Sequence, residues 1–225
     1  MKRSIFVTGG TGYMGQRLIP LLLRRGHRVK ALVRKGSESK LPVGAIGFVG
    51  DALKAQSYAA EVSDEDTFVH LIGVPHPSPA KARQFREVDL ISIQAAISAA
   101  GAAQVRHFVY LSVAQPAPVM QAFLEVRHQG EQMIRASGIP ATFLRPWYVL
   151  GPGHWWPYAV VPVYWILERL PATKEGAHRL GLITIRQMLN ALIWAIENPP
   201  PDVRILDVPK IREVASASCR WSEPG

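Results

Sequence analysis

A glycine-rich turn between an apolar strand and an amphipathic helix constrains this chain most. Residues 5–15 read IFVTGGTGYMG, so glycines recur at every third position from Gly9 to Gly15. Gly9 permits a tight turn, Gly12 lets a ligand approach the backbone, and Gly15 lets the helix pack closely on the strand. The helix N-terminus then presents unpaired N–H groups to an anion. The turn predicts a dinucleotide diphosphate site formed by Thr8, Gly9, Gly10, Thr11, Gly12, Tyr13, Met14 and Gly15.

Strand and helix patterns alternate over most of the 225 residues. Alternation of this kind is typical of parallel strands joined by crossover helices, so we expect an α/β, Rossmann-like, doubly wound sheet with helices on both faces. Strands are expected at Ser4–Thr8, Arg28–Arg34, Ile46–Val49, Thr67–Ile72, His107–Ser112 and Ala141–Leu144. Helices are expected at Met14–Arg25, Ser57–Glu61, Lys81–Ala100 and Gln121–Ser137.

The pattern changes after Leu144 to chain rich in proline and tryptophan. Length and a hydrophobic content of 48% fit a single domain, with a core over 1–146 and a small substrate-side lobe over 147–212 built on the same sheet. The tail over 213–225 is small and polar, and we expect it to be poorly ordered. Within the lobe we expect helices at Tyr158–Leu170 and Arg186–Asn198 and a strand at Arg204–Val208.

The formal net charge of +9 raises the question of nucleic acid. The basic residues are scattered and match no nucleic-acid module, so we do not expect a nucleic-acid partner. A denser basic cluster does occur within residues 24–40, where only Glu38 is acidic. The single cysteine, Cys219, excludes a cysteine cluster for metal and favours a cytoplasmic location. We expect no metal site, no secretory signal and no transmembrane segment.

The end of the second strand bears on the choice of cofactor. In a dinucleotide fold, an acid there would repel a ribose 2′-phosphate, whereas a basic residue would pair with it. Here Arg34 and Lys35 end the strand and no acid occupies the turn. This predicts NADP(H), with NAD(H) as the alternative if Arg34 is only a solvated residue at a strand end. Asp51, with Ala52, follows the third strand and can contact the adenine.

Taken together, these motifs resemble the atypical short-chain dehydrogenase/reductases, in the NmrA-like, NAD(P)H-binding branch often labelled NAD-dependent epimerase/dehydratase. The resemblance covers about residues 3–210 and adds further cofactor contacts at Leu71, Ile72, Gly73, Ser112, Arg127 and Pro146. It rests on residues 8–15 and on Val33-Arg34, Gly50-Asp51, His70 to Gly73, Leu111-Ser112, Gly130-Glu131 and Leu144-Arg145-Pro146.

The resemblance also places the catalytic residues of the family. Its enzymes use a Ser after the fifth strand and a Tyr-x-x-x-Lys pair on the next helix. Ser112 matches the serine, but aligning Glu131 on the acid that follows the lysine puts Phe123 at the tyrosine and Arg127 at the lysine. Because phenylalanine has no proton to transfer, the usual mechanism is unavailable. Ser112 and Tyr148 are the remaining catalytic candidates, with His76 and His154 as weaker ones.

Three interpretations stay open. The first is a reductase that passes hydride from NADPH to an apolar acceptor, such as a quinone or an activated alkene or carbonyl. The second is a non-catalytic NADP(H)-binding redox sensor or assembly subunit. The third, a sugar-nucleotide epimerase or dehydratase, is disfavoured because those enzymes also need the Tyr-Lys pair.

An aromatic cluster in the expected lobe bears on the partner. These rings can wall an apolar pocket, contact a membrane surface, or simply pack the lobe or a homodimer interface. The cluster consists of Trp147, Tyr148, Trp155, Trp156, Tyr158, Tyr164 and Trp165.

Overall fold

The computed structural model describes residues 2–62, 67–117, 119–152 and 180–219. Its centre is a seven-stranded parallel sheet in the order β3-β2-β1-β4-β5-β6-β9. The expected α/β doubly wound fold is confirmed. The strands are β1 (Ser4–Thr8), β2 (Arg28–Val33), β3 (Ile46–Val49), β4 (Thr67–His70), β5 (Phe108–Leu111), β6 (Ala141–Leu144) and β9 (Val203–Leu206).

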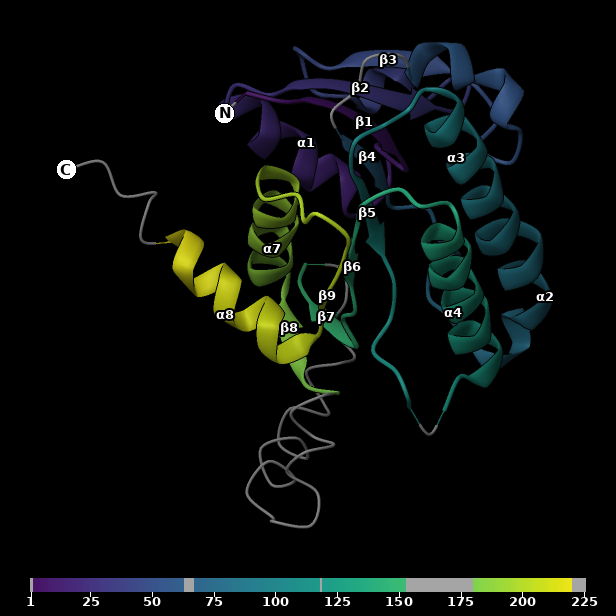
Figure 1. Ribbon diagram of the computed structural model, residues 1–225, viewed down its shortest axis with the longest axis vertical. Helices are drawn as coiled ribbons and strands as arrows, with labels where there is room; N and C mark the ends of the chain where they lie inside the picture. Colours follow the sequence, from purple (N-terminus) through teal and green to yellow (C-terminus); the bar gives the residue numbers. More distant parts are fainter. Residues whose placement is uncertain (1, 63–66, 118, 153–179, 220–225) are drawn as a thin grey trace.

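Helices cover both faces of the sheet (Figure 1). One face carries α1 (Gly15–Arg24), α7 (Ile185–Glu197) and α8 (Val208–Cys219). The other carries α2 (Ala82–Gln84), α3 (Ile91–Ala102) and α4 (Gln121–Ala136). A second, two-stranded parallel sheet pairs β7 (Tyr148–Leu150) with β8 (Leu182–Thr184); it was not expected from the sequence.

The strands contribute side chains to two hydrophobic cores, one on each face of the sheet, because successive side chains of a strand point to opposite faces. Ile5 and Val7 of β1 are fully buried in the core beneath α1 and α7, whereas Phe6 between them is buried in the core beneath α3. The strand order reverses between β1 and β4. Ligands of doubly wound sheets bind at such a reversal, beyond the carboxyl ends of the strands. The glycine turn after β1 lies there.

The long helix expected over Lys81–Ala100 is not one regular helix. A 3₁₀ turn (Pro79–Lys81), the short α2 and a π-helical segment, η5 (Phe85–Leu90), precede α3. A π segment adds a residue to the turn and thereby changes which side chains face inward. Asp89, within this segment, is only 1% exposed. The helix expected over Ser57–Glu61 is likewise replaced by two 3₁₀ turns, Ala55–Ser57 and Ala59–Val62.

The expectation of a poorly ordered tail from residue 213 is wrong up to Cys219, because α8 continues through it. Ile211, Val214 and Ala215 are buried, and the first two join the core that contains α7. The apolar residues at 211, 214 and 215 form a short pattern among small and polar residues, which is why the sequence did not indicate a helix there. Residues 220–225 lie outside the described part.

The segment expected to form a lobe contributes to the main fold where it is described. β9 pairs with β6, and α7 packs with α1 over the sheet. The expected helix over Tyr158–Leu170, the candidate His154 and the aromatic residues from Trp155 onward lie outside the described residues, so the extent of the lobe stays a prediction. None of the helices in the described ranges is long and apolar enough to cross a membrane.

Candidate functional site

The glycine turn has the geometry that its sequence predicts. Gly9 adopts φ +79°, and a Cβ there would lie 3.0 Å from the carbonyl carbon of Leu71 at the end of β4. A Cβ on Gly15 would lie 2.4 Å from the Gly9 oxygen. The Gly12 amide donates to the Gly9 carbonyl at 3.0 Å and closes the turn. Both Gly9 and Gly15 are therefore required by close backbone contact.

Gly12 is less closely packed against other backbone than Gly9 and Gly15. A Cβ built there has only the Gly9 oxygen, 3.2 Å away, within 4 Å, so the glycine otherwise borders open space. Helix α1 begins beside it with Met14 at the N-cap position, where no side chain caps the helix, and the first turn carries no acid. An uncapped, acid-free helix start next to an open glycine fits a diphosphate. The residues present thus fit the phosphate part of a dinucleotide.

The end of β2 carries two unneutralised cations. The Arg34 and Lys35 side chains are exposed and make no hydrogen bond or ion pair within the part of the chain that the structure describes. Asp51 follows the neighbouring strand β3. The Gly50 amide before it donates to the Val33 carbonyl at 3.0 Å, which brings this loop next to the end of β2. The Asp51 carboxylate accepts from the Leu53 amide at 3.0 Å and lies 3.7 Å from Lys54. The nearest acid on this edge is therefore partly neutralised by its own loop.

A buried polar chain lies below the turn. Thr8 Oγ1 hydrogen-bonds His70 Nδ1 at 2.8 Å, and His70 Nε2 lies 3.4 Å from Ser92 Oγ. Burial, followed by the nearby charge of Arg127, lowers the pKa of His70 to about 3. The imidazole is therefore neutral at physiological pH and acts as a fixed hydrogen-bonding group. Thr8, expected to contact the cofactor, is itself only 1% exposed.

Arg127, at the position of the family's lysine, is buried in a set of protein contacts. Its Nη2 donates to Asp89 Oδ1 at 2.6 Å, and Asp89 Oδ2 accepts the Val74 amide at 3.0 Å. Nη1 donates to the Leu111 carbonyl at 2.9 Å, and Nη2 approaches the Ile72 carbonyl at 3.4 Å. The guanidinium thereby joins the chain after β4 to the end of β5. A Cβ on Gly73 would lie 2.3 Å from Nη2, so the glycine makes room for the arginine.

Ser112 occupies the expected place after β5, but its proton has a protein acceptor. Its Oγ donates to Glu131 Oε1 at 2.6 Å. Gln115 donates to the same oxygen at 3.1 Å, and Arg145 pairs with both oxygens of the carboxylate. Glu131 is 1% exposed, and its charge is balanced by Arg145. Ser112 thus belongs to a closed network at the carboxyl edge.

Phe123 has no hydroxyl to offer a substrate, whereas Tyr148 has one. Phe123 packs against Phe85 with ring centroids 5.1 Å apart and lies against the Arg127 guanidinium. Tyr148 lies half-buried on β7, with its ring 5.3 Å from that of Trp147. Burial raises the pKa of the Tyr148 hydroxyl, which keeps it protonated at neutral pH.

The remaining predicted residues lie around the same edge. Leu71 donates its amide to the Thr8 carbonyl at 3.1 Å, and Pro146 accepts from Ala114 at 2.9 Å. His76, at φ +50°, is exposed in the loop after β4. Ala52 lies beside Asp51 in the loop after β3. The structure thus gathers the predicted cofactor residues at the carboxyl ends of the strands.

Asp89 is the residue that the sequence analysis missed. A signal was present, because Phe85, Asp89, Ser92 and Ala96 follow the spacing of one helix face, and the other three are buried. A carboxylate on such a face needs a cationic partner. Arg127 is that partner.

Comparison with known proteins decides the family. The model of a family described as NAD(P)H-binding matches residues 9–152, more than half of the chain. The chain belongs to this NAD(P)H-binding family. Membership agrees with the glycine turn, and the resemblance to atypical short-chain dehydrogenase/reductases is confirmed.

Two curated relatives of this NAD(P)H-binding protein carry different names. A ceramide reductase of Caulobacter vibrioides is 30% identical over 97% of this chain and 67% of its own length. A photosystem II assembly factor, Ycf39, of Trieres chinensis is 26% identical over 63% of this chain and 44% of its own length. The chain thus spans two thirds of the first relative and less than half of the second.

Solved structures support the fold. The Bordetella bronchiseptica enzyme WbmH in complex with NAD⁺ superposes with a TM-score of 0.68, covering 100% of this chain and 84% of that one. Its sequence identity of 19% limits the comparison to architecture.

Proposed function

We propose that this protein is an NADP(H)-dependent reductase of an apolar carbonyl or quinone acceptor. The observation that carries the proposal is the uncapped start of α1 beside Gly12, at the reversal of the strand order. The basic end of β2 favours the 2′-phosphorylated cofactor. The ceramide reductase relative, aligned over 97% of the chain, supports reduction of an apolar substrate.

Each part of the site has a distinct role in this proposal. The amides after Gly9 hold the diphosphate, and Arg34 with Lys35 pairs with the 2′-phosphate. When bound, NADPH would supply a hydride to the acceptor, and solvent would supply the proton that the acceptor oxygen takes up. Arg127 does not touch the reacting atoms in this scheme; it fixes the ends of β4 and β5 through Ile72 and Leu111.

Tyr148 is the residue proposed to hydrogen-bond the acceptor oxygen. Phe123 has no proton, and Ser112 donates its own to Glu131. Tyr148 follows β6 closely, and its hydroxyl carries a proton at neutral pH, as an ordinary phenol does; burial raises its pKa further. A hydroxyl of this kind stabilises developing negative charge on an oxygen by donating a hydrogen bond.

NADPH titration followed by an oxidation assay tests the proposal. The wild-type protein is expected to bind NADPH and to oxidise it with long-chain ketones, enals or quinones. Tyr148→Phe is expected to lower kcat by about 10²-fold, the usual effect of losing one donor to an oxyanion, with NADPH affinity unchanged. Equal kcat in this variant would remove Tyr148 from the mechanism, and absence of turnover on the whole panel would reject the reductase.

Gly12→Asp provides the binding control. A carboxylate at this place repels the diphosphate, and the Cβ has a single close neighbour, so the domain is expected to fold without binding NADPH. Gly101→Asp is the matched variant, because a Cβ there meets nothing within 4 Å. If Gly12→Asp binds NADPH as tightly as Gly101→Asp does, the diphosphate assignment is wrong.

A non-catalytic NADP(H)-binding subunit is the second candidate. Phe123 at the tyrosine position and the closed Ser112–Glu131 contact favour it, and the assembly-factor relative has the corresponding kind of name. NADPH binding without turnover on any acceptor would favour this function. A sugar-nucleotide epimerase is disfavoured, because Phe123 and Arg127 replace the pair that such chemistry needs.

A further inference from the structure

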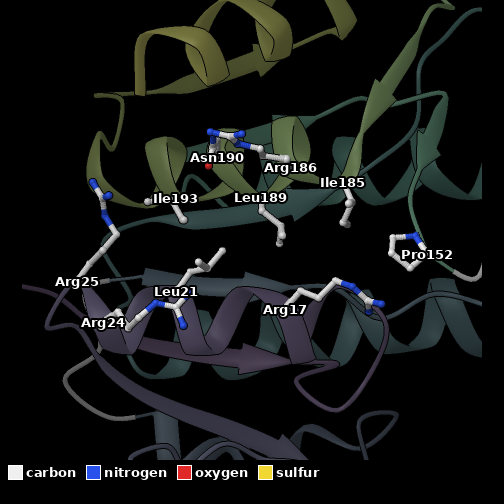
Figure 2. Close-up of a pocket in the computed structure, with 10 residues that line it drawn as sticks. All are labelled: Arg17, Leu21, Arg24, Arg25, Pro152, Ile185, Arg186, Leu189, Asn190 and Ile193. Atoms are coloured by element: carbon white, nitrogen blue, oxygen red, sulfur yellow. The ribbon is translucent and has the colours of Figure 1, made fainter. Parts of the chain in front are cut away.

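A groove runs between α1 and α7 (Figure 2), and at its Arg17 end it adjoins the glycine turn, because Arg17 donates to the Tyr13 carbonyl at 2.8 Å. It encloses about 490 Å³, within the range of small-molecule sites. Arg24 and Arg25 lie at one end and Pro152 at the other, and α1 and α7 form the two sides.

The floor of the groove is aliphatic. Leu21 projects from α1, and Ile185, Leu189 and Ile193 project from α7 into the space between the helices (Figure 2). The groove extends from Arg17 to Arg25, which corresponds to about 12 Å along a helix. A floor of this shape fits a narrow, flexible hydrocarbon chain.

The rim of the groove is cationic. Four of its ten lining residues are arginines, Arg17, Arg24, Arg25 and Arg186, and none is acidic. Arg17 donates to the Tyr13 carbonyl at 2.8 Å, and Arg25 forms two hydrogen bonds with the Glu197 carboxylate, at 2.7 and 2.9 Å.

Arg24 differs from its neighbours. It is exposed and has no hydrogen-bond or ion-pair partner in the described ranges. Its positive charge is therefore available to a ligand, and it stands at the end of the groove opposite Pro152.

Other occupants fit this groove less well. None of the ten lining residues in the described part of the chain is aromatic, so these residues offer a nucleobase no ring to stack on. A second copy packed on the same surface would bring eight guanidinium groups together. A folded protein partner needs about 800 Å² on each side, more than a groove of this length offers.

We propose that this groove binds a single-chain anionic lipid, such as a medium-chain fatty acid. The head group pairs with Arg24, and the chain lies along Leu21, Leu189 and Ile193 toward Pro152. The head group thus lies at the end of the groove opposite Pro152, and the proposal does not depend on the reductase function.

Calorimetric titration with dodecanoate, below its micelle concentration, tests this proposal. Dodecanoate is expected to bind at one site, whereas dodecanol, which lacks the charge, and acetate, which lacks the chain, are each expected to bind at least about tenfold more weakly. Equal binding of dodecanol would show that the arginines are not used. Equal binding of acetate would mean that a small anion suffices. Either result, or no binding of dodecanoate, overturns the proposal.

Two variants locate the ligand. Arg24→Glu is expected to weaken dodecanoate binding by about tenfold or more, because it replaces attraction with repulsion. Leu21→Trp is expected to weaken it by filling the floor. Arg86→Glu makes the same charge change at an exposed arginine of η5 and should leave binding unchanged. If the groove variants bind like Arg86→Glu, the lipid binds elsewhere and the proposal fails.

Discussion

Arg127 occupies the position of the family's lysine but makes structural contacts within the protein. It sits where the family has a lysine, yet its guanidinium is only 6% exposed and is bonded to Asp89 and to the Leu111 carbonyl. A buried ion pair gives weak evidence of net stabilisation, but loss of one partner leaves the other charge buried and unpaired. We therefore expect the stability of the fold to depend on Arg127 and Asp89 as a pair.

Arg127→Met tests that dependence. We expect it to lower the free energy of unfolding by about 3–5 kcal/mol, because Asp89 stays buried without its cationic partner. Asp89→Asn in the same chain should restore most of the loss, since an amide can still accept from Val74. Urea denaturation measures both. Arg83→Met, which breaks an exposed pair with Glu87, is the control and should change stability by less than about 1 kcal/mol. Comparable losses at the two arginines would contradict the argument.

Arg34 makes a separate residue-scale prediction. Arg34→Asp should reverse the cofactor preference, because an acid beside the ribose repels a 2′-phosphate and accepts from free hydroxyls. The measurement is the ratio of NADPH to NADH dissociation constants. Lys40→Asp, with the same charge change in the loop after β2, should leave the ratio unaltered. A ratio that does not move in Arg34→Asp would mean that this arginine is only a solvated surface residue.

Among the secondary-structure elements, α8 is where sequence and structure differ most. Its buried residues attach the end of the described chain to α7, so it behaves as part of the core. Ile211→Ala should reduce the free energy of unfolding by about 2–5 kcal/mol, because this side chain is 0% exposed. Ser216→Ala, on the exposed side of the same helix, should have little effect. Chemical denaturation of the two variants compares them, and equal stabilities would mean that α8 is not docked.

The elements with strong local patterns were predictable, and those set by distant contacts were not. β1 and β6 have the predicted bounds because alternating or continuous apolar residues mark buried strands directly. β3 also has the predicted bounds, although it is a largely exposed edge strand. The glycine turn was also readable, since its spacing encodes its backbone geometry. Asp89 in the π-helical segment pairs with Arg127, which is 38 residues away, and no local pattern reports such a partner. The β7–β8 pairing is equally non-local.

On the scale of the whole molecule, two buried histidines link stability to pH. Burial lowers the pKa values of His70 and His107 to about 3, with smaller effects from nearby arginines. Both are neutral in the folded state, whereas in the unfolded chain they take up protons below about pH 6.5. Protons therefore favour unfolding, and stability falls as pH drops from about 6.5 toward 3.

The expected slope is about 1.4 kcal/mol per pH unit for each histidine once the pH is well below 6.5. Urea denaturation at several pH values between 7 and 5 measures it, above the range in which most carboxylates titrate. His107→Gln should reduce the slope, whereas His128→Gln, on the exposed side of α4, should not. A slope that is the same in both variants would show that His107 is protonated in the folded protein.

The contacts around Arg127 also bear on how this site could change over generations. A lysine there has a single nitrogen in place of a guanidinium that bonds Asp89 and the Leu111 carbonyl together. A tyrosine at Phe123 would place a hydroxyl beside the packed ring of Phe85. A Tyr-Lys pair in this chain would therefore need two substitutions together with new partners for Asp89 and the Leu111 carbonyl.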